Sequence, residues 1–133
     1  MNTKIMVDTS IWIEFFRNEN SQISNYLKSQ LRYRQVVISG MILAEILQGI
    51  RSARELLLVK RSLESLPFIE IDKKVWQQAG EMSASLRKKG ITIPLSDIII
   101  GCSAIMEGYE IYTLDPHFEK IPNLKLHKPD RSH

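Results

Sequence analysis

Four carboxylates stand out in this sequence because each one ends, interrupts or begins an apolar stretch. Asp8 ends the run KIMV, and Glu45 interrupts MILAEILQGI. Asp97 begins DIIIGCSAIM, and Asp115 follows IYTL. No lysine or arginine is adjacent in sequence to any of the four. Oxygen ligands of this kind bind hard divalent cations, so the chemistry to examine first is that of a Mg²⁺ or Mn²⁺ centre.

Each of these acids also has a purely structural interpretation. Asp8 is typical of a helix N-cap, and Asp115 before a proline is typical of a turn. Glu45 fits an ordinary position at the margin of a helical apolar stripe. Asp97 falls in the first turn of a predicted helix, where the helix dipole favours an acid.

Asp97 is the most informative of the four acids. Its side of the predicted helix carries only small residues, namely Gly101, Ala104 and Gly108. This stripe predicts that the same side of the helix packs closely against a sheet, with the carboxylate directed at the strand ends. An unpaired carboxylate held there requires a cation, because burial of a lone charge is costly.

The elements that must position these acids follow from the hydrophobic pattern. Short β-branched or apolar runs predict strands over residues 4–7, 36–38, 68–71 and 110–113, with an edge strand over 124–126. Helical periodicity predicts helices over residues 9–16, 20–31, 39–51, 53–65, 74–89 and 96–107. We expect Asp72 and Ser96 to cap the last two helices, and Gly90 and Gly108 to end them.

Alternation of short strands with helices predicts a three-layer α/β/α sandwich around a short, mostly parallel central sheet. Strand ends and helix starts share one edge of such a sheet, and ligands bind there. We therefore expect Asp8, Asp97 and Asp115 to approach one another, with Glu45 leaning in. Like charges at short range destabilise a fold, and bound divalent cations offset that repulsion.

Composition limits the class of protein. The chain has 133 residues, is 44% hydrophobic and 25% charged, and shows no repeat or linker, which predicts a single domain over residues 1–133. Cys102 is the only cysteine, so no intrachain disulfide forms, and a reducing cytoplasm is the expected location. Asp8 and Glu14 interrupt the N-terminal apolar stretch, which argues against a signal peptide, and no stretch is apolar enough to span a membrane.

The chain also carries a small basic excess, with 18 basic and 15 acidic residues. Several basic residues are clustered, and the clusters include Arg51, Arg54, Lys60 and Arg61, and also Arg87, Lys88 and Lys89. Such clusters suit a polyanionic partner, and they are equally typical of the solvated outer faces of helices.

Taken in order, VDTSIWIEFFR, AEILQGI, LSDIIIGCSA and YTLDPHFEKIP resemble the motifs of PIN-domain nucleases, and more narrowly those of the VapC-type toxins of toxin–antitoxin pairs. The resemblance covers essentially the whole chain. It implies a PIN-like fold and a metal-dependent ribonuclease that cleaves RNA with Mg²⁺ or Mn²⁺ and is inhibited by a cognate antitoxin. It assigns Asp8, Glu45, Asp97 and Asp115 to the catalytic, metal-binding acids.

The resemblance also implies supporting positions around these acids. Thr9 and Thr113 match hydroxyl positions near the site. His117 stands where many relatives carry a further acid, which leaves open how firmly a second metal is held. His117 is a candidate for phosphate contact or proton transfer, or else a bystander. We assign no role to His127 or His133.

Surplus hydrophobic residues predict partners. Residues 56–59 read LLLV, and the 96–107 helix is apolar on more sides than one sheet covers. A deep core explains this surplus, and so does a homodimer face together with a groove for an antitoxin segment.

Two other classes of function remain open from the sequence. A Mg²⁺-dependent phosphotransfer domain also uses an aspartate at a strand end, but the second aspartate of the haloacid dehalogenase pattern is replaced here by Ser10. A catalytically idle RNA- or protein-binding module would leave the acids without metal. Metal-dependent thermal stabilisation separates that class from a nuclease, because an ion that binds only the folded state stabilises it.

Overall fold

A parallel sheet of four strands lies at the centre of the computed structural model, which describes residues 3–33 and 36–129. The strands follow the order β3-β2-β1-β4, and all their pairings are parallel. Their bounds are β1 (Ile5–Val7), β2 (Val36–Ser39), β3 (Phe68–Ile69) and β4 (Glu110–Tyr112). The carboxyl ends of all four strands therefore point to one edge of the sheet.

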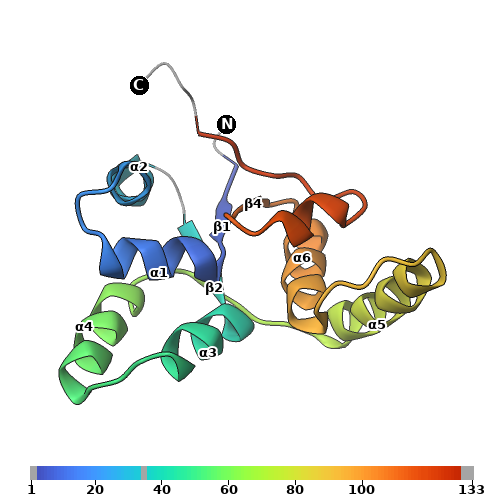
Figure 1. Cartoon of the computed structure of the whole chain (residues 1–133), viewed down its shortest axis with the longest axis horizontal. Helices are drawn as coiled ribbons and strands as arrows, with labels where there is room; N and C mark the ends of the chain where they lie inside the picture. The colour runs from blue at the N-terminus through green and yellow to red at the C-terminus, as the bar shows by residue number, and fades with distance from the viewer. Residues whose placement is uncertain (1–2, 34–35, 130–133) are drawn as a thin grey trace.

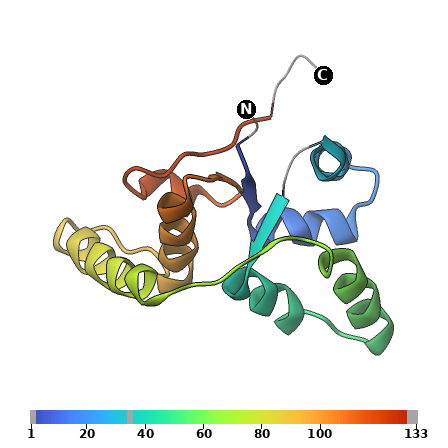
Figure 2. The ribbon, with the colours of Figure 1, turned by 180° about the vertical axis from the view of Figure 1, so that it is seen from behind.

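Helices cover both faces of this sheet (Figures 1 and 2). On one side lie α5 and α6, and on the other lie α1, α2 and α4. Helix α3 follows β2 directly and contacts both α1 and α6. The bounds are α1 (Thr9–Arg17), α2 (Gln22–Tyr33), α3 (Gly40–Gln48), α4 (Ala53–Leu63), α5 (Lys73–Lys88), α6 (Leu95–Glu107) and the 3₁₀ helix η1 (Pro116–Lys120). The predicted three-layer α/β/α architecture is confirmed.

The core forms between the two helical layers. Every residue of β1 and β2 is buried, as expected of parallel strands that are covered on both faces. The largest fully buried side chains are Trp12 of α1 and Phe118 of η1. The strand ends that carry the acids are thus anchored in the buried core.

The predictions that Asp72 begins α5 and that Gly108 ends α6 are confirmed, and Ser39 also caps α3. Ser39 and Asp72 accept hydrogen bonds from the first turns of α3 and α5, and Gly108 ends α6 in the left-handed conformation. The prediction that Ser96 caps α6 is wrong, since Pro94 occupies that position and makes no side-chain capping bond. Helix α3 ends at Gln48 rather than near residue 51, because Gly49 terminates it.

At Gly101, the stripe of small residues on α6 faces the segment that follows η1, while α6 also contacts β4 of the sheet. A Cβ atom at Gly101 would lie 2.9 Å from Cδ1 of Ile121, a residue that follows η1. The glycine therefore allows η1 to approach α6 closely. This contact brings the segment after β4, with Asp115 and His117, against the helix that carries Asp97.

The segment that follows η1 protects the edge of β4. The predicted strand over residues 124–126 is reduced to a single parallel bridge between Leu126 and Ile111. Ile111 donates its N–H to Lys125 and accepts the N–H of His127, at N–O distances of 2.9 and 2.7 Å. Within the described parts of the chain, no helix is both long enough and apolar enough to cross a bilayer.

Candidate metal centre and active site

Asp8 directly follows β1 and is buried, with 4% of its surface exposed. Its Oδ2 accepts hydrogen bonds from the hydroxyl groups of Ser10 and Thr113, at 2.9 and 2.8 Å, and from the Ser10 N–H at 3.4 Å. Asp8 is therefore the N-cap of α1 and also a buried carboxylate at the edge of the sheet. The two interpretations of this residue are compatible.

Thr113 links Asp8 to Asp115. Its hydroxyl group donates to Asp8 and accepts the backbone N–H of Asp115 at 2.9 Å. Sequence reasoning missed Ser10, whose hydroxyl group also accepts the N–H of Leu114 at 3.0 Å. The position of Ser10, two residues after a capping aspartate, was the signal that could have found it.

Glu45 lies on α3, half-buried as its place at the margin of the apolar stripe predicts. Its Oε1 accepts a hydrogen bond of 2.8 Å from the Thr9 hydroxyl group. Thr9 is adjacent to Asp8 in the sequence, so this bond orients Glu45 toward the end of β1.

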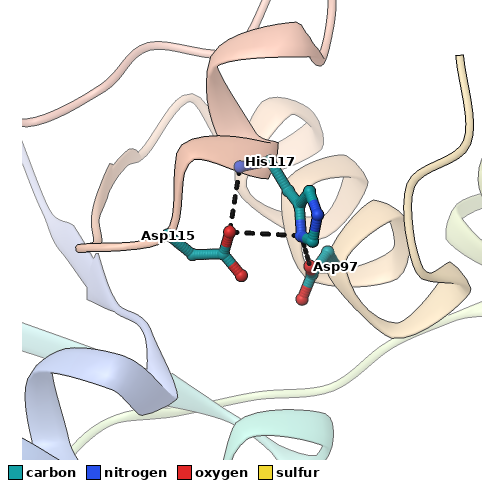
Figure 3. A group of neighbouring side chains, drawn as sticks. All are labelled: Asp97, Asp115 and His117. Carbon is teal, nitrogen blue, oxygen red and sulfur yellow. Dashed lines mark hydrogen bonds and ion pairs between the residues drawn. The ribbon is translucent and has the colours of Figure 1, made fainter.

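Asp97, Asp115 and His117 form the tightest group (Figure 3). One ligand atom from each of the three lies within 4.8 Å of the others. The Nδ1 atom of His117 is 3.2 Å from Oδ2 of Asp97 and 3.1 Å from Oδ1 of Asp115. That Asp115 oxygen also accepts the backbone N–H of His117 at 2.9 Å, so Asp115 caps η1. The predicted turn or short helix after Asp115 is confirmed.

The carboxylates act on one another electrostatically. Burial, followed by the charges of Asp115 and Asp8, raises the pKa of Asp97 to about 6. The hydrogen bond with His117 opposes this shift, and the charge of Glu45 adds to it. The other three predicted acids thus act on Asp97 electrostatically, although the hydroxyl group of Thr113 links only Asp8 and Asp115.

The donor set fits a hard or borderline divalent cation. It consists of carboxylate oxygens and one imidazole, and no lysine or arginine among the described residues forms an ion pair with any of the four acids. Clustered negative charge without a basic partner favours a bound cation. Neither Cys102, which is buried in α6, nor Ser10, which bonds to Asp8, pairs with a histidine in the manner of a nucleophile.

Comparison with known proteins gives the family. The PIN domain model matches residues 5–124, and the chain therefore belongs to the PIN domain family. Ribonuclease VapC of Rickettsia bellii is 31% identical over 133 residues, with 92% of this chain and 93% of that protein covered. Ribonuclease VapC2 of Rickettsia felis is 27% identical over 131 residues, covering 95% and 98%.

A solved structure extends the comparison to three dimensions. It is the VapBC2 complex from Rickettsia felis bound to a DNA fragment from its promoter. The matched chain is 25% identical and gives a TM-score of 0.81, with 96% of this chain and 99% of that chain covered. The PIN-like fold expected from the sequence is confirmed.

Proposed function

We propose that this chain is a divalent-metal-dependent endoribonuclease and the toxin of a toxin–antitoxin pair, and that residues 1–133 form its single nuclease domain. The observation that carries the proposal is the pairing of buried Asp97 with Asp115 at the carboxyl edge of a PIN-domain sheet. The relatives that are named ribonucleases support RNA as the substrate.

In this proposal Asp8, Glu45, Asp97 and Asp115 hold Mg²⁺ or Mn²⁺. When bound, such an ion polarises the scissile phosphate and lowers the pKa of the attacking water. The chain itself provides the fixed geometry. Thr113 orients Asp8 while holding the backbone of Asp115, and no side-chain nucleophile takes part.

We also propose that an antitoxin segment occupies the groove between α1, α3 and α4. This groove lies beside Glu45, and its apolar lining consists of Ile13, Phe16, Ile46, Ile50 and Val59. Leu57 and Leu58 of α4, which are 52% and 56% exposed, add further exposed apolar surface on the same helix. In this proposal an amphipathic helix of the antitoxin packs its apolar face on these residues, and its contact with Glu45 places it next to the acids.

For the homodimer we propose a different face. Phe68 of β3 and Trp76 of α5 are 47% and 48% exposed, and they border a hollow of about 350 Å³. Burying two large aromatic side chains between copies gives a strong contact. Light scattering of wild-type protein and of Trp76→Glu tests this face: the variant is expected to be monomeric, and an unchanged dimer would exclude it.

Cleavage of an RNA pool by purified, antitoxin-free protein tests the central proposal. We expect cuts with Mg²⁺ or Mn²⁺, none with EDTA, and none from Asp8→Asn or Asp97→Asn. Glu107→Gln is the matched control, because it makes the same change of acid to amide at the exposed far end of α6. Folded wild-type protein that cuts nothing under any condition would instead favour a binding module.

A further inference from the structure

His117 is directed at the centre of the candidate metal site by three local features. Its side chain is 43% exposed, so packing in the core does not explain its orientation. Pro116 begins η1, and the N–H of His117 donates to Asp115. Gly101 lets η1 approach α6, which brings the ring to Asp97. In Figure 3 the Nδ1 edge of the ring faces both carboxylates, while the other ring nitrogen points away.

The distances around Nδ1 match those between neighbouring ligands of a single cation. Two ligands at right angles around an ion, with bonds of about 2.1 Å, lie about 3 Å apart. Nδ1 is 3.2 Å from the Asp97 oxygen and 3.1 Å from the Asp115 oxygen. The same spacing suits a hydrogen bond in metal-free protein. The ring would therefore not need to move in order to bind an ion at this position.

The charges around Nδ1 of His117 also favour a bound cation. Nδ1 carries at most one proton, and two carboxylate oxygens compete for it. The group of Asp97, Asp115 and His117 therefore sets two carboxylates against one imidazole. A divalent ion bound there would offset the excess of negative charge.

On the basis of the proposed function, we propose that His117 is a metal ligand through Nδ1 and that it makes the site selective for Mn²⁺ over Mg²⁺. Mg²⁺ prefers oxygen ligands and retains its waters, whereas imidazole binds transition ions more readily. An acid at this position would make an all-oxygen site. The histidine thus sets which divalent ion the enzyme binds most tightly.

Nitrogen coordination provides a readout that is independent of activity. Pulsed electron paramagnetic resonance of Mn²⁺ bound to the full-length protein is expected to show ¹⁴N coupling in the wild type. His117→Ala and His117→Asp are expected to lack it, although His127 is present in both. Bound Mn²⁺ without ¹⁴N coupling in the wild type would overturn the proposal.

Calorimetric titration with Mn²⁺ and with Mg²⁺ measures the selectivity. We expect His117→Ala to lose at least about tenfold in Mn²⁺ affinity while changing little toward Mg²⁺. His117→Asp is expected to bind Mg²⁺ more tightly than the wild type. Lys120→Gln, an exposed change on the same short helix, should leave both affinities unchanged. An unaltered ratio of the two affinities in His117→Ala and His117→Asp would refute the selectivity.

The variant Asp97→Asn separates this inference from the proposed function. If Asp97→Asn abolishes Mn²⁺ binding and His117→Ala leaves the Mn²⁺ affinity unchanged, the acid centre stands and only the role of His117 falls. If Asp97→Asn binds Mn²⁺ as tightly as the wild type, the ion lies elsewhere and the proposed centre falls with it.

Discussion

Two histidines of this protein pair with carboxylates, and their surroundings differ. His117 lies at the carboxyl edge of the sheet, with one nitrogen facing two acids and 43% of its side chain exposed. His127 lies beside β4, with 8% of its side chain exposed. Its Nδ1 is 2.8 Å from Glu110, and its Nε2 is 2.6 Å from the Tyr26 hydroxyl group.

The difference separates a candidate binding site from a structural clamp. Both nitrogens of His127 have one partner each, and its ring stacks on Tyr26 and meets Tyr112 edge-on. Nothing is left over for a ligand. At His117, by contrast, two carboxylate oxygens face the single nitrogen Nδ1, and the ring is accessible to solvent. A histidine–carboxylate pair therefore indicates an ion site only where negative charge exceeds what the protein itself neutralises.

The largest expected effect is the loss of RNA cleavage when an acid beside His117 is changed. If the proposed function holds, Asp97→Asn should lower the rate of metal-dependent RNA cleavage about a thousandfold, corresponding to about 4 kcal/mol, because it would remove a ligand from the ion that stabilises the transition state. Single-turnover cleavage measures this loss. Activity within tenfold of the wild type would show that Asp97 is not a required ligand.

The two histidines should differ in their contribution to stability. His127→Ala removes two hydrogen bonds and two ring contacts from a buried position, so it should cost about 3–4 kcal/mol of unfolding free energy. His117→Ala should cost under about 1 kcal/mol in metal-free protein, since its ring is accessible. Urea denaturation measures both. Equal losses would contradict the distinction drawn between the two residues.

The pH dependence of the unfolding free energy should reveal the raised pKa of Asp97. Its pKa is about 6 in the folded state and near the ordinary value of 3.8 when unfolded, so the folded state binds the proton more tightly. Lowering the pH from 7.5 through 6 toward 4 should therefore stabilise metal-free protein, by up to about 3 kcal/mol from this group.

Denaturation of metal-free wild type and of Asp97→Asn across this pH range isolates that contribution. The difference in unfolding free energy between the two proteins should change below pH 6. A constant difference across the range would mean that the raised pKa is absent.

The smallest expected effect concerns Thr113, which connects Asp8 to Asp115. Thr113→Val keeps the shape of the side chain but removes one donor and one acceptor. We expect cleavage to fall about tenfold, since each such bond contributes about 1 kcal/mol. Thr113→Ser, which keeps the hydroxyl group, should retain most activity. Equal rates for the valine and serine variants would argue against a positioning role.

The sequence determined the architecture and the candidate acids. Short apolar strands alternating with amphipathic helices define a parallel sheet covered on both faces, because each element must bury its apolar side. Because such strands run parallel, the acids that follow them, Asp8 and Asp115, lie at one edge of the sheet. These features depend on local periodicity and on general packing rules, which can be read directly from the residues.

The tertiary structure alone decided which side chains meet. From the sequence, His117 is only a supporting candidate and His127 has no role. Only their neighbours across the fold distinguish the two residues. The contact of Gly101 with Ile121 joins residues 20 positions apart, and so does the contact of Asp97 with His117. Such contacts depend on how whole elements pack, and no local pattern carries that information.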